Sequence, residues 1–462
     1  MVALPAYYRS IKQTLPARER MLAWLGTATR FGRWQFVSQG LQLFTGFMLI
    51  RWLSYESYAQ LGLTLTFQNM LGQLVECGFS DAILALVGER VHDREVVGRY
   101  LWSALSQRTR MLAILTPLSG LAFYWFVRVH AWPALTSALL FVSIIALLFF
   151  QGWGSIFSQP LLMHQQLAPL YRPQVGLSAG KLALCYLLKS LGGLGAASIC
   201  WINVLATAAL GIVYRSTARP FFTEPDRVDK ATNREMRRYL APLIFGMLFY
   251  AFHGQIQMFL ISTFGNNKSI AEVAALGRIG QLLVFGSAFT STLLVPYMAR
   301  VPLHTLARRY AQALAGILLL CGSLSLMAFL FPSIFLVLLG AKYSSLHSEL
   351  VLAVGASSVS FVSGALYGFN NARKWTTHAA TVAGIIGTIA IDLILIWRLD
   401  LGITRNVLIL SLLTNAFSVL PNAYAAVVGY RRDLAAPSDS AAVPCWSAMN
   451  DGPDCEPWKT ED

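Results

Sequence analysis

The stretch that decides the fold lies near the middle of the chain, where residues 215–239 read RSTARPFFTEPDRVDKATNREMRRY. Its seven lysines and arginines, with prolines at 220 and 225, make it the most basic connection between apolar runs. It separates two apolar halves of nearly equal length, 34–214 and 240–428. We therefore predict two domains joined by a basic linker.

Each half contains six runs of about 20 mostly apolar residues, the length that a membrane-spanning helix requires. The predicted spans are 34–53, 58–80, 111–128, 134–158, 175–194, 196–214, 240–264, 273–298, 311–331, 348–369, 376–397 and 403–428. The expected fold class is an all-α membrane protein with about 12 transmembrane helices. They would form two six-helix bundles, related by pseudo-two-fold symmetry, around a central cavity.

The composition of the 462 residues agrees with a membrane protein. Hydrophobic residues make up 56% and charged residues only 13%, whereas soluble domains carry about 25% charged residues. The formal net charge is nevertheless +14. Few charges with a cationic excess argue against a nucleic-acid-binding protein, a disordered chain, a coiled coil and a disulfide scaffold.

The placement of the basic residues predicts the orientation in the membrane. With the N-terminus inside, 27 of the 36 lysines and arginines fall in cytoplasmic segments, as the positive-inside rule requires. We therefore expect a basic cytoplasmic segment at 1–33 and a disordered cytoplasmic tail at 429–462, in a multi-pass protein with both termini in the cytoplasm.

A short motif occurs at the start of the second span in each half. It is Ala59-Gln60-Leu61-Gly62 in the first half and Ala274-Ala275-Leu276-Gly277 in the second. A four-residue match is weak alone, but its position in two equal halves gives it weight. Parallel repeats are typical of transporters that rock two bundles about a central site.

Polar residues recur at helical spacing inside several spans. Gln39 and Gln42 share one stripe, Gln73 and Glu76 a second, and His253 and Gln257 a third. Such stripes either line a hydrated cavity or hydrogen-bond neighbouring helices. Serine, threonine and asparagine stripes in the eleventh and twelfth spans allow the same two interpretations.

The ionisable groups in or beside the spans are candidates for binding and coupling. Glu76 lies well inside a span and needs a cation or a proton, and it is a candidate for ion coupling together with Asp392. Arg51, Lys189 and Arg278 could give the cavity a positive field suited to phosphate, or each could anchor a helix at the interface. We find no motif for a catalytic residue, a metal ligand or a nucleotide cofactor.

Several junctions resemble those of the polysaccharide and oligosaccharide (O-antigen type) flippases, a family of the multidrug/oligosaccharidyl-lipid/polysaccharide (MOP) exporter superfamily. They are Ile50-Arg51-Trp52-Leu53-Ser54, Glu76-Cys77-Gly78-Phe79-Ser80, Phe331-Pro332-Ser333-Ile334 and Leu339-Gly340-Ala341-Lys342-Tyr343. The chain departs from the family where Tyr58-Ala59-Gln60-Leu61-Gly62 replaces the usual Tyr-Gly pair. The resemblance covers about residues 30–430.

The resemblance implies alternating access between two bundles, without enzymatic activity. The substrate would be a polyprenyl-diphosphate-linked oligosaccharide, flipped across a bacterial inner membrane for O-antigen, capsule or exopolysaccharide synthesis. Membrane lipids, a polysaccharide polymerase and chain-length machinery are the expected partners. The predicted cavity residues are Gln39, Gln42, Arg51, Gln73, Glu76, Lys189, His253, Gln257 and Arg278.

Two alternatives stay open at this point. One is an ion-coupled multidrug extruder of the same superfamily, whose cationic substrates would favour acidic residues in the cavity. The other is a membrane polysaccharide polymerase or ligase, which usually presents a large outer loop. No outer loop in the predicted layout exceeds about 15 residues, which disfavours this class.

Overall fold

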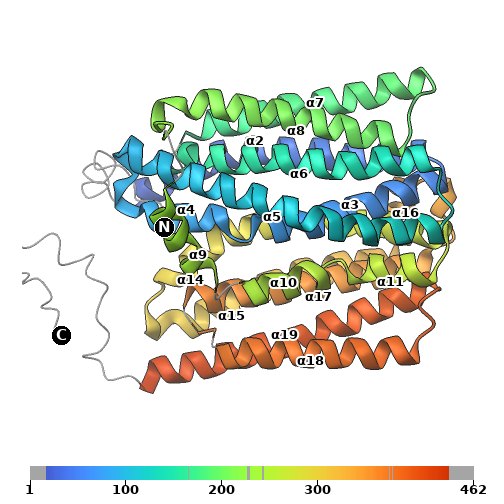
Figure 1. Cartoon of the computed structure of the whole chain (residues 1–462). Coiled ribbons are helices and arrows are strands. Elements are labelled where there is room, and N and C mark those ends of the chain that lie inside the picture. Colours follow the sequence, from blue (N-terminus) through green and yellow to red (C-terminus); the bar gives the residue numbers. More distant parts are fainter. Residues whose placement is uncertain are drawn as a thin grey trace, which may run out of the picture.

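The computed structural model describes residues 17–164, 166–225, 229–241, 244–373, 375–376 and 378–435, and their regular structure is helical (Figure 1). The first half consists of α2 (Ala17–Trp52), α3 (Tyr55–Glu76), α4 (Phe79–Val87), α5 (Arg94–Val129), α6 (Ala134–Met163), α7 (Leu167–Ser190) and α8 (Ala196–Ala218). Residues 1–16 and 436–462, and with them most of the predicted terminal segments, lie outside the described residues.

The second half follows the short connecting helix α9 (Lys230–Leu240). Its helices are α10 (Ile244–His253), α11 (Ile256–Phe264), α12 (Asn267–Gly280), α13 (Val284–Phe289), α14 (Val295–Arg300), α15 (Leu303–Leu330), α16 (Pro332–Leu339), α17 (His347–Ala372), α18 (His378–Arg398) and α19 (Thr404–Ala435). Helices thus cover all or part of every predicted span.

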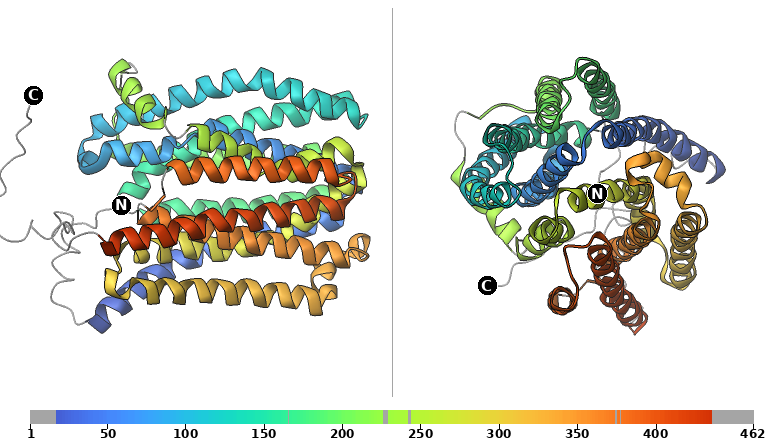
Figure 2. Two further views of the ribbon diagram at one scale, coloured as in Figure 1. Left: turned by 90° about the horizontal axis from the view of Figure 1, so that it is seen from below. Right: turned by 90° about the vertical axis from the view of Figure 1, so that its right-hand side faces the viewer.

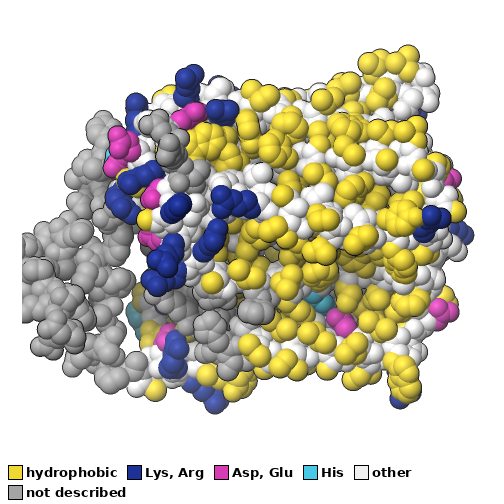
Figure 3. Space-filling view, in the orientation of Figure 1, with side chains coloured by type: hydrophobic (Ala, Val, Ile, Leu, Met, Phe, Trp, Pro, Cys, Tyr) yellow, Lys and Arg dark blue, Asp and Glu magenta, His cyan; other side chains and the backbone are white. Residues whose placement is uncertain are grey.

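The chain is an all-α, multi-pass membrane protein, as the sequence predicts. Among the described residues, nine helical segments are long and apolar enough to cross a membrane. Large apolar side chains such as Leu319 and Trp397 are exposed around the sides, and they colour most of the face in Figure 3. A water-soluble protein would not expose such a surface. The number of twelve spans and the symmetry of the two halves stay predictions.

Charged side chains gather at one end of the molecule. Figure 3 shows lysine and arginine concentrated at the end where α9 lies in Figure 1. We call this the basic end, and we call the opposite end, where α2 ends and α3 begins, the far end. In the predicted orientation the basic end is cytoplasmic.

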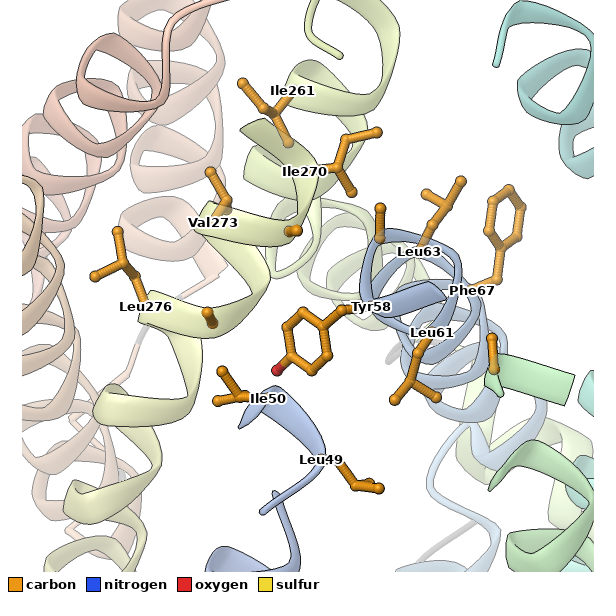
Figure 4. Packing of buried hydrophobic residues seen from close by; sticks show 14 of the residues in the cluster. Leu49, Ile50, Tyr58, Leu61, Leu63, Phe67, Ile261, Ile270, Val273 and Leu276 are labelled. Carbon is orange, nitrogen blue, oxygen red and sulfur yellow. The ribbon is translucent and has the colours of Figure 1, made fainter. Parts of the chain in front are cut away.

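The two halves lie side by side and meet along α3 and α12 (Figure 2). A β-carbon added at Gly62 of α3 would lie only 2.8 Å from the β-carbon of Ala274 of α12. The two copies of the short repeated motif therefore pack against each other. Figure 4 shows Tyr58 pointing from α3 toward α12, which carries Val273 and Leu276. This apolar cluster joins the halves.

Three predicted spans are interrupted. The span 58–80 breaks at Cys77 and Gly78, whose φ angles of 39° and 73° are left-handed and end α3. A carboxylate oxygen of Glu76 then accepts a hydrogen bond from the Ser80 amide (3.2 Å), inside the first turn of α4. The span 240–264 breaks between α10 and α11, and 273–298 is divided among α12, α13, a π-helical turn and α14.

The basic linker is attached to the first half through α9. Asn233 Oδ1 accepts hydrogen bonds from Ser103 (2.6 Å) and Gln107 (3.0 Å) of α5, and Tyr100 donates to Glu235 (2.7 Å). The apolar side of α9 is buried, with Met236 fully inaccessible. Helix α9 therefore packs as part of the first half.

Candidate functional site

A polar cavity of ≈ 440 Å³ lies inside the second half, between α10, α11, α17, α18 and α19. Its polar lining consists of hydroxyl, amide, phenol and imidazole groups: Tyr250, His253, Gln257, Ser360, Ser363, Tyr367, Thr376, Thr381, Thr388, Ser411, Thr414, Asn415, Ser418 and Asn422. Aspartate, glutamate, lysine and arginine are absent from the described lining. The cavity is polar and nearly free of charge.

The polar stripe of the twelfth predicted span forms one wall of this cavity. Ser411, Asn415, Ser418 and Asn422 follow one face of α19 because they are three or four residues apart. Ser418 and Asn422 both donate to the Ser363 hydroxyl of α17, at 2.8 and 3.1 Å. These bonds hold the side chains in place, as buried polar groups require.

A second cavity of ≈ 530 Å³ adjoins the first and extends between α12–α14 and α17. The two share Gln257, Ser411 and Asn415 in their linings. Gln257 donates a hydrogen bond from its amide nitrogen to the Ser411 hydroxyl. The predicted site residue Gln257 therefore lies where the two spaces meet.

His253 and Asp392 come together at the edge of the first cavity. Nδ1 of His253 lies 3.4 Å from Oδ2 of Asp392, and the Thr414 hydroxyl donates to Oδ1 of Asp392 (2.6 Å). The imidazole stacks on Phe249, with ring centroids 5.3 Å apart. Asp392 is 5% exposed. A carboxylate so deep in a membrane protein needs a cation or a hydrogen-bond donor beside it. The Thr414 hydroxyl is such a donor, and the His253 imidazole lies close enough to form an ion pair when it is protonated.

Glu76 lies in the first half and is paired there with Arg108 of α5. Arg108 also donates to Ser155 of α6 (2.7 Å), and its side chain is 3% exposed. The sequence predicts either a cation or a proton for Glu76, and the predicted spans leave Arg108 in the loop between 80 and 111. The signal in the sequence is a carboxylate inside an apolar span, because such a group requires a nearby cation or a proton.

Arg51 and Lys342 connect the two halves at the far end. The Arg51 guanidinium donates to the main-chain carbonyls of Val337 and Leu338 at the end of α16. In return, Lys342 donates to the Leu53 carbonyl (2.6 Å), just beyond the end of α2. Cations are favourable at helix C-termini, so each basic residue stabilises a helix end of the other half.

The remaining predicted site residues are dispersed. Lys189 lies over the Trp52 ring (4.8 Å), and Arg278 donates to Gln281 (3.1 Å) and packs against Gly46. Gln42 donates to Ser38 (3.3 Å), and Gln39 is half-buried in α2. Gln73 is exposed on α3. Only His253 and Gln257 of the predicted set line the two polar cavities, and the role of the others in binding stays a prediction.

Metal binding receives no support from the described residues, where no group of three His, Cys, Asp or Glu side chains is placed to hold an ion. Cys185, Cys200 and Cys321 are buried and unpaired within apolar helices, and Cys77 is buried and unpaired in the turn between α3 and α4. They act there as small packing residues.

Comparison with solved structures shows the same fold. A multidrug resistance transporter of the MATE family of the MOP superfamily, in an inward-facing conformation, superposes with a TM-score of 0.63 at 16% identity. The match covers 86% of this chain and 96% of the other. The lipid II flippase MurJ, in an inward closed conformation, also gives 0.63, at 14% identity over 87% and 89% of the two chains.

A MOP superfamily transporter from Pyrococcus furiosus, described as having a binding pocket of reversed polarity, gives 0.56 at 14% identity over 87% and 94%. The sequence matches no family model and no curated protein. The likeness establishes that this chain has the fold of MOP superfamily transporters.

Proposed function

We propose that the protein is a transporter that flips a polyprenyl-diphosphate-linked oligosaccharide across the bacterial inner membrane by alternating access. The product would serve O-antigen, capsule or exopolysaccharide assembly. Polysaccharide polymerase and chain-length proteins would take the sugar on the outer side. In this proposal the protein moves its substrate across the membrane and does not change it chemically.

The observation that carries the proposal is the neutral polar lining of the cavity in the second half. Sugar hydroxyl groups both donate and accept hydrogen bonds. Serine, threonine and asparagine side chains can also donate and accept, so they can bind either way. Phe249, Tyr250 and Tyr367 add rings for the apolar faces of sugar rings. A few placed polar groups among apolar ones are typical of small-molecule sites.

The fold supports movement of the two halves relative to each other. The halves touch along α3–α12 and α3–α10 and at the far end, where Arg51 and Lys342 bind opposite helix ends. Outward opening has to break these far-end bonds. In the predicted orientation the described conformation is therefore closed on the outer side.

Ion coupling is assigned to Asp392. Protonation or cation binding at this carboxylate would change its interaction with His253 and Thr414, which belong to two other helices of the same cavity. A ligand can shift a conformational equilibrium only through a difference in its affinity for the two states. Transport driven by an ion gradient or membrane potential would use that difference.

The experiment that tests the function is deletion of the gene in its own bacterium. The proposal expects lipid-linked oligosaccharide to accumulate on the cytoplasmic face while surface polysaccharide disappears. Complementation with the intact chain should restore both. Normal surface polysaccharide in the deletion strain contradicts the proposal.

A multidrug extruder is the second candidate, because Asp392 is an acid beside a cavity that also contains aromatic rings. Cationic drugs would pair with that acid. The same deletion strain separates the two functions, since loss of an extruder increases sensitivity to cationic dyes and leaves lipid-linked sugars unchanged.

A further inference from the structure

A cationic pocket of ≈ 700 Å³ lies at the far end, between the end of α2 and the segment that joins α16 to α17. Its ionisable lining consists of Arg51, Lys342 and His347, and Ser333 and Ser344 add hydroxyl groups. Aspartate and glutamate are absent from the described lining. Figure 3 shows basic side chains at this end, beside the position of α16 in Figure 1. The pocket therefore offers positive charge and hydrogen-bond donors to an anion.

The arginine and the lysine of this pocket are not neutralised by carboxylates. The ion pairs between described residues involve other cations. Arg51 donates through Nε and Nη2 to main-chain carbonyls, and Lys342 donates to the carbonyls of Leu53 (2.6 Å) and Arg51 (3.5 Å). A carbonyl has no net charge, and a guanidinium carries five N–H donors and an ammonium three. Both side chains therefore keep their charge and have donors left for a ligand.

Contacts across the two halves hold the walls of the pocket in place. The Tyr55 hydroxyl of α3 donates to the Lys342 carbonyl, and its ring centroid lies 5.4 Å from that of the buried Tyr343. Gly340 has a left-handed φ of 97°, and a β-carbon there would lie 3.1 Å from Cγ of Arg51. The backbone thus brings Arg51 and Lys342 together before any ligand arrives. Donors that are already placed lose little freedom on binding.

The chemistry of the lining suits a phosphate group. A guanidinium can donate two parallel hydrogen bonds to phosphate oxygens, an ammonium adds a point charge, and a serine hydroxyl adds a donor. The pocket also borders an apolar surface, since Val337 of its lining and Ile334 one turn earlier are both exposed. Such a surface faces lipid in a membrane protein. The phosphate of an anionic phospholipid can therefore enter from the side, and a free phosphate from the water.

We propose that this pocket binds a phosphate group at the outer surface of the membrane, and that the bound anion holds the two halves together there. Arg51 belongs to the first half, whereas Lys342, His347 and Ser344 belong to the second. An anion that contacts both sides binds best while the halves are close, and a ligand shifts an equilibrium toward the state that it binds better. The anion is thus a regulator of outward opening. The inference goes beyond the proposed function, because it holds for a flippase and for a drug extruder alike.

Amide hydrogen exchange tests the binding and the bridging together. The purified full chain is placed in nanodiscs of zwitterionic phosphatidylcholine, with or without phosphatidylglycerol. We expect phosphatidylglycerol to slow exchange in residues 52–57 and 340–346, which lie on the two sides of the pocket. The slowing should reach roughly tenfold at about nine-tenths occupancy, because a ligand of the closed state competes with opening.

Two matched variants separate the pocket from a general effect of the charged membrane surface. Ser344→Asp places a negative charge in the lining, whereas Ser345→Asp places it on the next residue, which is exposed and outside the described lining. Neither substitution removes a donor of Arg51 or Lys342. We expect Ser344→Asp to abolish the slowing and Ser345→Asp to keep it, and Ser344→Lys should increase it. Equal slowing in the two aspartate variants overturns the inference.

Pyrophosphate, added to nanodiscs that contain only phosphatidylcholine, identifies the source of the phosphate. Slowing by phosphatidylglycerol assigns the pocket to a lipid headgroup. Slowing by pyrophosphate, lost in Ser344→Asp, assigns it to a free phosphate and supports the site equally. Exchange in the intact protein that neither compound changes overturns the inference. Because the measurement requires no transport, that result leaves the proposed function intact.

Discussion

Both halves of the molecule are helical, but their interior polar groups differ. Those of the first half include a charged pair, and those of the second half are mostly uncharged. In the first half, Glu76 pairs with Arg108, and the Ser155 hydroxyl accepts a hydrogen bond from Arg108 and donates one to Glu76. In the second half, uncharged side chains surround an open space of ≈ 440 Å³, and His253 and Asp392 lie close together at its edge. The polar groups of the first half form a salt bridge that links α3 to α5, whereas those of the second half line a cavity.

The largest effect should come from breaking the pair in the first half. Arg108→Gln leaves Glu76 without its cation, and removal of one partner of a buried pair costs about 3–5 kcal/mol of unfolding free energy. Thermal unfolding in detergent should show a clear loss of stability. The double variant Glu76→Gln, Arg108→Gln is the matched control and should recover much of it. An unchanged midpoint of thermal unfolding for Arg108→Gln would contradict a stabilising role for the pair.

The next largest effect should be a loss of gradient-driven transport when the contact between His253 and Asp392 is changed. Asp392→Asn keeps an oxygen that can accept the Thr414 hydrogen bond but removes the charge. We expect near-normal stability and a loss of gradient-driven transport of roughly 5–150-fold, the usual range of coupling between sites. Flux into liposomes under an imposed ion gradient measures it. Asp81→Asn, at an exposed acid of the first half, is the control. If transport by Asp392→Asn depends on the ion gradient as strongly as transport by the unaltered protein, Asp392 does not couple transport to the gradient.

A smaller effect, on the KM for the sugar lipid, should distinguish two glutamines that the sequence predicts as cavity residues. Gln257→Ala removes a side chain at the junction of the two polar cavities, and Gln73→Ala removes one on α3. One lost hydrogen bond amounts to about 0.5–1.5 kcal/mol, so the KM for the sugar lipid should rise a few-fold for Gln257→Ala. We expect less change for Gln73→Ala. A larger KM shift for Gln73→Ala moves the sugar site to the first half.

The smallest expected effect is a pH dependence of the stability of α9, which attaches the linker to the first half. The Thr232 hydroxyl, followed by the Ala231 and Thr232 amides, lowers the pKa of Asp229 at the start of α9. A lowered pKa means that this cap contributes above the ordinary pKa of an aspartate, about 3.9, and is lost as the pH falls through the lower folded value. Hydrogen exchange of residues 230–240, corrected for intrinsic rates, should lose protection in acid. Asp229→Asn should remove most of this pH dependence, and an unaltered profile contradicts the capping role.

The sequence predicted the fold class because long apolar runs and the positions of arginine and lysine depend little on packing. The apolar pattern alone does not predict the breaks at Cys77–Gly78 and before Ile256, since a helix can be interrupted within an apolar run without a change in hydropathy. Only the family resemblance pointed to a junction at Glu76-Cys77-Gly78-Phe79-Ser80. The motif at Ala59 and Ala274 was informative, because its small residues allow α3 and α12 to approach closely.

The candidate site was predicted only in part. His253, Gln257 and the α19 stripe were identified by their spacing. Spacing cannot say which half contains the cavity, nor that Arg51 donates to carbonyls of residues 286 and 287 positions away in sequence. These facts depend on how helices from distant parts of the chain are placed together.

The most direct test of the account is a flipping assay with the purified protein in liposomes that contain a fluorescent polyprenyl-diphosphate-linked oligosaccharide. We predict transfer between leaflets that requires the protein and an ion gradient and that stops when Asn415→Trp fills the cavity of the second half. Failure to move the sugar lipid, with extrusion of a cationic dye that the same substitution blocks, would contradict the account and assign the cavity to drug export.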